Sequence, residues 1–397
     1  MSEKPYAEIP LAEFQGRIAK AKKLMEKHGI NGLLLFCREN QIYYGGWRDT
    51  WDYNFMTAVI VSQKGPVTFV GPGHVHFGAQ LYTYIDEIKR YEELIKGSDG
   101  CGAVIQKIGE MGLAEKRIGL EMGYGMYSFT ATLSEISRIK NSFSKATFVD
   151  ATDMIWEQRM IKTDWELDLY RKLAKIAALG FKVGLETAGE GVTERQIQDE
   201  MWKYYLKEGI MDTLMQGGII IRVHPYQEYF PAFTGRAQER PMRRGDQLML
   251  DGGPAFKGYH TDMQRQCVIS PPDDLQKRLT ELATVGYEAA TGLLRPGTPV
   301  KELWRAALEA QRKHAPNYSP SWGFVGHGIG LRIHEPPTLT AHEEMTLKPG
   351  MVLTVEVAGY DIPNWRVMGA FPEDMYIITE SGHEILTGDC PRKLWVR

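Results

Sequence analysis

Two acidic residues flank a glycine- and proline-rich turn in LMLDGGPAFKGYHTDMQR, which runs from Leu248 to Arg265. The apolar residues before the turn and the β-prone residues after it predict a hairpin. If the turn is centred between Phe256 and Lys257, Asp251 lies directly opposite Asp262. Like charges opposed across two strands destabilise the pair, and burial increases the cost. The pair therefore calls for a compensating cation.

A second segment repeats this arrangement in TVEVAGYDIPNWRVMGAFPEDMYII. Glu356 lies in a β-branched strand and Glu373 in a returning one, and their midpoint falls between Asn364 and Trp365. Asp374 is the alternative to Glu373, because alternation along a strand turns one of the two inward and the other outward. The sequence thus predicts two facing carboxylate pairs on two hairpins.

A glycine-rich segment, GFVGHGIGLRIHEPP, lies between the two hairpins. His327 is flanked by Gly326 and Gly328, and His334 follows seven residues later. Glycine on both sides of a residue permits close approach of the backbone and unusual dihedral angles. We expect a loop here that contributes to a ligand site.

The four carboxylates and one neutral imidazole carry a formal charge of −4, which two divalent cations would cancel. Ligation by oxygen with one imidazole and no thiolate suits manganese, which we favour, and also cobalt, iron or zinc. Two such ions supply a nucleophile at neutral pH and polarise the carbonyl that it attacks. The predicted chemistry is hydrolysis.

The composition is that of an ordinary globular protein, with 397 residues of which 43% are hydrophobic and 24% charged. A net charge of −3 offers no basic surface for nucleic acid or for a membrane, so a small molecule or a dipeptide is the expected partner. The four cysteines are far apart and form no C-x-x-C pair, which argues against disulfides and thiolate metal sites. The N-terminus lacks the apolar core of a signal peptide, and no apolar run is long enough to span a membrane, so we expect a cytoplasmic protein.

The elements that must position these residues fall into two predicted domains, residues 1–160 and 161–397. In the first, an amphipathic helix at Leu11–Lys27 is followed by short strands at Gly32–Phe36, Ala58–Ser62 and Val67–Val70. This alternation predicts an α/β domain.

The second domain has helices alternating with antiparallel hairpins, which predicts an α+β fold. Capping boxes at Thr163–Glu166 and Thr193–Gln196 open two helices. A strand is expected at Gly218–Arg222, with further helices at Asp273–Leu294 and Pro299–Lys313.

The ordered set of acids and histidine, with the contexts G-H-G-I-G…H-E, V-E-V and P-E-D-M-Y-I-I-T-E-S-G, resembles the M24 metallopeptidases, which have the pita-bread fold. The first half is similar to the creatinase/prolidase N-terminal domain, including N-Q-I-Y-Y-G-G at Asn40–Gly46. The resemblance implies a homodimer in which five residues bind two metal ions: Asp251, Asp262, His327, Glu356 and Glu373. It favours Glu373 over Asp374, and it implies that His334 acts on the substrate near the scissile amide.

The resemblance implies an Xaa-Pro dipeptidase or aminopeptidase, and the alternative is a non-peptidase relative acting on a small amino-acid derivative, ectoine-hydrolase-like or lyase-like. A metal-free, creatinase-like protein would be expected to lack ligands, and none of the five is missing. The proline-specific relatives usually carry an arginine two residues before the last glutamate, where this chain has Phe371. They also carry a histidine where this chain has Thr234. Both changes would affect the substrate side of the site.

The remaining substrate-binding candidates are Phe371 itself and His224. His224 precedes a proline and could either enter the active site or end a strand. Aromatic residues at Trp47, Trp51 and Tyr53 crowd one segment of the first domain, and they could form core or contact a substrate.

Overall fold

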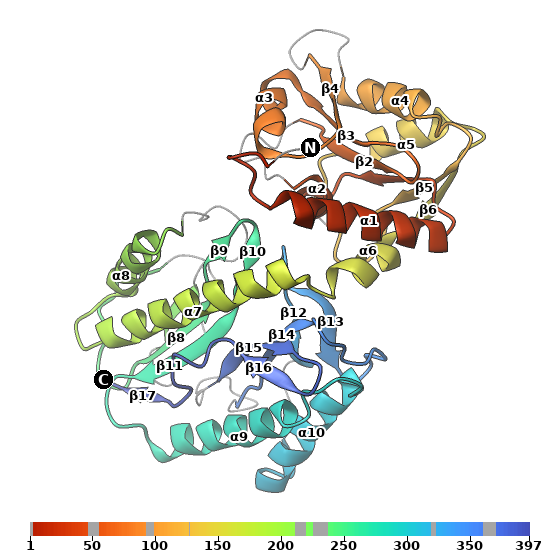
Figure 1. The fold of residues 1–397 in the computed structure, drawn as a ribbon. Coiled ribbons are helices and arrows are strands. Elements are labelled where there is room, and N and C mark those ends of the chain that lie inside the picture. Colours follow the sequence, from red (N-terminus) through yellow and green to blue (C-terminus); the bar gives the residue numbers. More distant parts are fainter. Residues whose placement is uncertain are drawn as a thin grey trace. The chain divides into compact units, whose positions relative to one another are not determined.

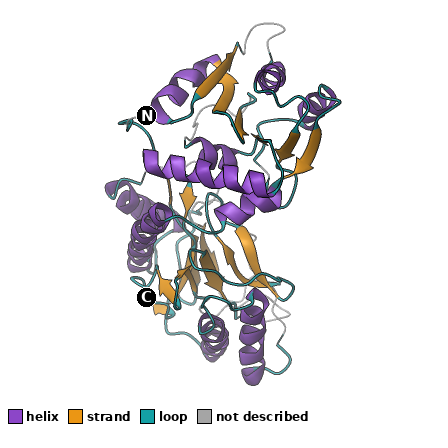
Figure 2. Ribbon diagram, turned by 45° about the vertical axis from the view of Figure 1, so that its right-hand side comes forward, coloured by secondary structure: helices purple, strands orange, loops and turns teal. Residues whose placement is uncertain are grey.

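The computed structural model describes residues 3–46, 55–92, 99–126, 128–210, 237–318, 323–359 and 371–397, and the backbone alone of 220–224. The chain divides into two compact units, Met1–Arg159 and Met160–Arg397. Each unit contains its own sheet, and helices accompany the strands of both (Figures 1 and 2). Among the helices that the structure describes, none combines the length and apolarity needed to cross a bilayer.

The first unit is built on a six-stranded mixed sheet with the order β4-β3-β2-β1-β5-β6. Its elements are α1 (Leu11–Lys27), β1 (Gly32–Leu35), α2 (Arg38–Gly45), β2 (Ala58–Ser62), β3 (Val67–Pro72), α3 (Gly73–Tyr82), β4 (Glu87–Tyr91), α4 (Gly100–Glu110), β5 (Arg117–Leu120), α5 (Leu133–Asn141), β6 (Thr147–Asp150) and α6 (Thr152–Arg159). Strand β1 pairs in parallel with β5 and antiparallel with β2. The predicted α/β class is confirmed.

The core of this unit explains why its central strands β1 and β2 are almost continuously apolar. Leu34 and Ile60, on β1 and β2, belong to a buried cluster with Val104 and Ile108 of α4. Their neighbours along the strands face the other way and are buried too, as Leu33 and Leu35 show, while α1 and α2 contact β2. Strands covered on both faces show this pattern rather than alternation.

The second unit contains a nine-stranded sheet whose main path is β13-β12-β14-β15-β11-β8-β7, with β16 added to β15 and β17 to β11. The helices are α7 (Asp164–Thr187), α8 (Glu194–Lys207), α9 (Asp274–Thr291) and α10 (Val300–His314). The strands are β7 (Ile220–His224), β8 (Gln247–Gly252), β9 (Ala255–Phe256), β10 (Tyr259–His260), β11 (Met263–Val268), β12 (Phe324–Gly328), β13 (Glu335–Thr340), β14 (Val352–Glu356), β15 (Glu373–Ile378), β16 (His383–Ile385) and β17 (Trp395–Val396). Both capping boxes that the sequence predicts are formed, at the starts of α7 and α8.

The helices of the second unit cover the face of the sheet opposite to the one from which the predicted acids project. A Cβ atom built on Gly184 of α7 would lie 3.0 Å from Leu250, and the hydroxyl of Tyr287 on α9 donates to Asp374. Because neighbours along a strand point to opposite faces, Asp251 and Glu373 project away from these helices. The face bearing them is therefore the one that can receive a ligand.

The register predicted for the first hairpin is wrong by two positions. Strand β8 pairs with β11 so that Asp251 lies opposite Gln264, not opposite Asp262. The turn is centred between Lys257 and Gly258, whose φ angles of 53° and 82° are both positive. Two central residues with positive φ define the tight turn that matches the twist of a hairpin. Because the shift is even, the two aspartates still share a face.

The expectation of a loop around His327 is also wrong, because the residue lies within β12. Gly326 has a φ of 142°, and a Cβ atom there would collide with the carbonyl oxygen of Thr354 on β14. The pairing of β12 with β13 is interrupted by register shifts at the same place. The glycines therefore serve close approach between strands at an irregular part of the sheet.

Candidate metal centre

The sheet aligns three of the predicted acids in one line across four adjacent strands. Asp251 on β8 is paired with Gln264 on β11, which is paired with Glu373 on β15, which is paired with Glu356 on β14. Directly paired residues project from the same face of a sheet. We call these four residues the cross-strand row, and its one uncharged member is Gln264.

Asp262 joins this row from just before β11. It is two residues ahead of Gln264, and only 4% of its surface is exposed. Carboxylate oxygens of Asp251, Asp262 and Glu373 all lie within 4.8 Å of one another. Three negative charges at this separation, two of them on buried side chains, need a cation or protons between them.

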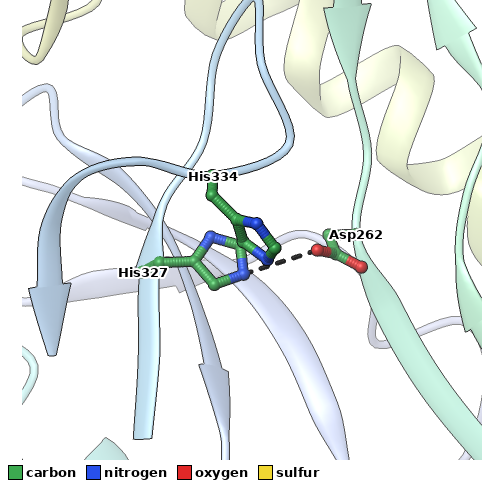
Figure 3. Close-up of side chains that lie close together, drawn as sticks. All are labelled: Asp262, His327 and His334. Atoms are coloured by element: carbon green, nitrogen blue, oxygen red, sulfur yellow. Dashed lines mark ion pairs between the residues drawn. The ribbon is translucent and has the colours of Figure 1, made fainter. Parts of the chain in front are cut away.

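His327 completes the cluster from β12. Its Nε2 atom lies 3.4 Å from Asp262 Oδ2, 3.6 Å from Glu356 Oε1 and 4.0 Å from Glu373 Oε1. Figure 3 shows the ring directed at Asp262, with the shortest of these contacts drawn as a dashed line. One imidazole nitrogen thus faces three carboxylates on three different elements.

The tautomer of His327 follows from its other ring nitrogen. Nδ1 lies 2.9 Å from the carbonyl oxygen of Gly328, and a carbonyl can only accept, so Nδ1 carries the proton. Burial lowers the pKa of His327 to about 4, which leaves Nε2 as a bare lone pair at neutral pH. A lone pair facing carboxylate oxygens is repulsive unless a metal ion or a proton lies between them.

Two atoms of the cluster are buried without a hydrogen-bond partner among the described residues, namely His327 Nε2 and Glu373 Oε1. Buried polar atoms are nearly always satisfied, so such exceptions indicate a missing ion or water. An imidazole nitrogen and carboxylate oxygens are suitable ligands for manganese, iron, cobalt or zinc. The residues therefore fit a metal centre.

The electrostatics of the acids lead to the same conclusion. Burial raises the pKa of Asp262 to about 7, and burial together with the charge of Asp262 raises the pKa of Asp251 to about 7. Burial and the neighbouring aspartates raise the pKa values of Glu356 and Glu373 well above the ordinary range. Without a metal, these groups hold protons near neutral pH.

His334 is exposed, unlike Asp262 and His327, which are buried. It is the exposed member of a group with Asp262 and His327 whose nitrogen and oxygen atoms lie within 4.8 Å of one another. Its ring meets that of His327 edge to face, with the centroids 4.2 Å apart (Figure 3). Partial burial, and then His327, lower its pKa to about 4. At neutral pH it is an uncharged imidazole that can donate or accept a proton.

Asp374, the alternative to Glu373, projects from the other face of the sheet. It receives hydrogen bonds from Arg265 Nη2 at 2.6 Å, the Tyr287 hydroxyl at 2.7 Å and the Thr387 hydroxyl at 2.6 Å. Arg265 also donates to the backbone oxygen of Glu373 at 2.7 Å. This buried network fixes β15 from behind, at the residue where Glu373 enters the cluster.

The structure describes only some of the predicted substrate-binding residues. Phe371 is 5% exposed, and its backbone N–H donates to Gln266 Oε1. His224 ends β7, but its side chain is outside the described part of the structure. The predictions for Thr234, Trp47, Trp51 and Tyr53 also concern residues that the structure does not describe.

The model of metallopeptidase family M24 matches residues 168–380, and that of the creatinase/prolidase N-terminal domain matches residues 17–161. The chain belongs to metallopeptidase family M24. It is thus a hydrolase of the metallopeptidase type, as the resemblance implied. The two matched segments account for most of the chain.

Similar proteins support this family membership over nearly the whole length of the chain. An Xaa-Pro dipeptidase of Pyrococcus furiosus is 30% identical over 382 residues, which cover 94% of this chain and 97% of that protein. An Xaa-Pro dipeptidase of Pyrococcus horikoshii is 27% identical over 380 residues, or 94% and 96% of the two chains. A prolidase structure from Thermococcus sibiricus superposes with a TM-score of 0.80 at 21% identity, covering 97% of this chain and 99% of that one. The pita-bread fold of the catalytic unit is confirmed.

Two residues around the candidate metal centre, Gln264 and Glu335, could not be identified as site residues from the sequence. Gln264 lies within the cross-strand row, and Glu335, next to His334, is buried within 3.8 Å of Lys162 Nζ. Glu335 also accepts a hydrogen bond from the backbone of Arg332 at 3.2 Å, which anchors the segment carrying His334. A buried acid directly after a candidate catalytic histidine was the available signal for Glu335. Nothing in the sequence distinguishes Gln264 from an ordinary strand residue.

Proposed function

We propose that this chain is a hydrolase that uses two divalent metal ions to cleave a C–N bond in a small substrate. The proposed metal ligands are Asp251, Asp262, His327, Glu356 and Glu373. The observation that supports this most strongly is the bare Nε2 of His327, which faces three carboxyl groups while the ring proton is held on Nδ1. Two divalent ions balance the charge of four carboxylates, and we favour manganese, with cobalt, iron and zinc as alternatives.

A bound metal pair supplies a nucleophile at neutral pH and polarises the carbonyl under attack. The chain's own contribution begins with the fixed ligand geometry of the cross-strand row, where each acid is held by a different strand. Gly328 orients His327 through its carbonyl oxygen, as neighbours of metal-binding histidines commonly do. Ligands held in this way need little rearrangement when the ions bind.

His334 is proposed to act on the substrate rather than as a ligand. It is exposed, uncharged at neutral pH and in edge contact with His327. A neutral imidazole at that place can hydrogen-bond the reacting carbonyl or transfer a proton at its Nε2. Its short distances to Asp262 and His327 would also permit ligation, so the two roles must be separated by experiment.

The substrate that we favour is a dipeptide with proline in the second position, or the N-terminus of a peptide with proline there. The support comes from relatives named Xaa-Pro dipeptidase that are 27% and 30% identical over nearly the whole chain. The proposal includes a homodimer, which is the assembly implied by the family resemblance. It also includes a cytoplasmic location, in keeping with four buried cysteines that form no disulfide.

A second candidate function is hydrolysis of a small non-peptide amino-acid derivative, or a lyase reaction on one. The observation that favours it is Phe371, an apolar and nearly buried side chain two residues from Glu373. A peptide backbone offers polar groups that must be paired in the complex, and an apolar neighbour leaves them unpaired at a cost in binding. A compact substrate with an apolar or cyclic part has fewer such groups.

Metal analysis followed by a substrate panel separates these candidates. The protein is loaded with Mn²⁺ or Co²⁺ and assayed on Gly-Pro, Leu-Pro and Met-Pro, and on small cyclic or N-acylated amino acids. Cleavage of Xaa-Pro dipeptides with two metals per chain supports the first candidate, and turnover of the non-peptides alone supports the second. Turnover that is unchanged after complete removal of metal would overturn both.

A further inference from the structure

Two buried glutamines on β11 connect the backbone of Phe371 to the carboxylate of Asp251. Gln264 and Gln266 are each 2% exposed, and alternation along the strand places both on the face of the cross-strand row. Gln266 Oε1 lies 2.5 Å from the Phe371 nitrogen, and Gln266 Nε2 lies 2.5 Å from Gln264 Oε1. Gln264 lies directly opposite Asp251 across the strand pair, and hydrogen bonding by its side chain lowers the pKa of that carboxyl. The chain of contacts is continuous.

The direction of this chain is fixed by its first member. A backbone N–H can only donate, so the oxygen of the Gln266 amide must face Phe371 and its NH₂ group must face Gln264. The oxygen of Gln264 accepts that bond, and its NH₂ group is therefore the part that remains for Asp251. One backbone N–H thus sets the orientation of two side-chain amides.

This orientation suits the charges that surround Gln264. The amide lies between Asp251 on β8 and Glu373 on β15, with Glu356 one strand further on and Asp262 two residues before it. Arg265 and Asp374 lie on the opposite face, where they pair with each other. An NH₂ group directed at this acidic set is attractive, whereas an amide oxygen in its place would be repelled by every carboxylate nearby.

We propose that Gln264 and Gln266 are positioning residues of the metal centre, forming a directed relay from the Phe371 N–H that presents a donor to Asp251. The donor holds the Asp251 carboxylate in one orientation and leaves its second oxygen for a metal ion. The proposal rests on the metal-binding role proposed above. Comparable support of ligands by neighbouring hydrogen bonds contributes about 10- to 100-fold to metal affinity.

The decisive comparison is between Gln266→Glu and Gln266→Met. The carboxylate closely matches glutamine in shape and keeps an acceptor for the Phe371 N–H, but it offers no donor. At alkaline pH, where the new group is ionised, Gln264 must turn its NH₂ group toward it and direct its own oxygen at Asp251. Methionine removes the acceptor but leaves Gln264 free to keep its donor on Asp251. The relay therefore predicts that the glutamate variant binds metal more weakly than the methionine variant.

A purely structural role for Gln266 instead predicts that metal affinity falls only in proportion to the melting temperature, because methionine leaves the Phe371 N–H unsatisfied and glutamate buries a charge. Mn²⁺ affinity is measured by calorimetric titration, and the absorption spectrum of bound Co²⁺ reports the ligand geometry. We expect a loss of about 10- to 100-fold in Mn²⁺ affinity and an altered Co²⁺ spectrum for Gln266→Glu. Gln264→Met, which removes the donor to Asp251, should show a loss of similar size.

The matched control is Gln158→Glu in the first unit. Gln158 is fully buried, and its Nε2 atom donates to the Arg17 carbonyl at 2.9 Å, so the change likewise replaces a buried amide by a carboxylate, in the unit that carries none of the proposed ligands. It should lower the melting temperature while metal affinity stays unchanged. If Gln266→Glu does not fold, Gln264→Met and Gln266→Met still test the relay, and equal wild-type affinity in both would overturn it.

The outcome also separates this inference from the proposed function. If the wild-type protein binds no Mn²⁺ or Co²⁺, the metal centre itself is refuted. If the wild-type protein binds two ions and Gln266→Glu binds them as tightly as Gln266→Met or more so, the metal centre stands and the relay is overturned.

Discussion

His327 Nε2 lies 3.4 Å from Asp262 Oδ2, and it offers that oxygen a lone pair, because the ring proton is held on Nδ1 by the carbonyl of Gly328. The distance is too long for a strong hydrogen bond and too short for two electron-rich atoms to be left facing each other in a buried place. The relationship joins β12 to the segment before β11, which are far apart in the sequence. The behaviour of the centre therefore depends on whether a metal ion or protons compensate the charge of the carboxylates.

Replacing His334 with alanine should lower turnover while leaving the metal content unchanged. The side chain is exposed and lies beside the cluster, and groups that donate a hydrogen bond or a proton in the transition state contribute about 10²- to 10⁴-fold to the rate. Steady-state kinetics and elemental analysis of the same preparation provide the two readouts. If His334→Ala empties the site, His334 is a ligand and the proposed division of roles is incorrect.

The buried apolar side chain of Phe371 should make the enzyme selective against the smallest dipeptide. We expect kcat/KM for Gly-Pro to be well below that for Leu-Pro or for a non-peptide amide. Phe371→Arg should raise the ratio of Gly-Pro to Leu-Pro, and Phe371→Leu, which stays apolar, serves as the control. A wild-type kcat/KM for Gly-Pro of about 10⁴ M⁻¹s⁻¹ or more would show that the missing arginine is unimportant.

The metal-free protein should lose stability as pH rises from about 5 to about 8. The pKa values of Asp251 and Asp262 rise from 3.8 to about 7 in the folded state, so between these values the folded chain binds more protons than the unfolded chain. A pKa change of one corresponds to about 1.4 kcal/mol of free energy, so the loss should amount to a few kcal/mol. Melting temperatures measured in chelator across this range test the prediction.

Metal should reverse this trend, because cations and protons compete for the same oxygens. In excess Mn²⁺ we expect stability to hold or rise over the same interval. A metal-free protein whose melting temperature increases between pH 5 and 8 would contradict the assignment of buried, mutually repelling acids.

The network behind Glu373 should contribute to stability. Arg265 and Asp374 are both fully buried and 2.6 Å apart, and removing one partner of such a pair costs about 3 to 5 kcal/mol. Arg265→Met should therefore shift the urea unfolding midpoint strongly. The double variant Arg265→Met/Asp374→Leu should recover part of the loss, whereas a double variant as unstable as the sum of the singles would argue against coupling.

The parts of this structure that follow local rules could be predicted from the sequence. Helix α1 has the predicted bounds, Leu11–Lys27, because its apolar spacing and its flanking Pro10 and Gly29 are local signals. The capping boxes at Thr163 and Thr193 were predictable for the same reason. The order of acids around His327 also predicted a cation, because buried like charges need compensation.

The parts that depend on distant strands could not be predicted. The register of the first hairpin depends on a positive φ at Lys257, a residue for which this conformation is uncommon. The strand through His327 depends on a backbone contact between Gly326 and Thr354. Gln264 acquires its place in the row from β8 and β15 on its two sides, and its own sequence neighbours carry no sign of that.

The metal content of the wild-type protein and of Asp262→Ala tests the proposed metal centre most directly. The protein is loaded with Mn²⁺, passed through a desalting column and analysed for metal per chain by mass spectrometry. We predict two ions for the wild type and a loss of metal and of activity for Asp262→Ala, because Asp262 lies within reach of both Asp251 and His327. Asp273→Ala, which removes the N-cap of α9 and should cost about 1 kcal/mol, is the control and should keep both ions. Two tightly held ions in Asp262→Ala, or none in the wild type, would contradict the proposed centre.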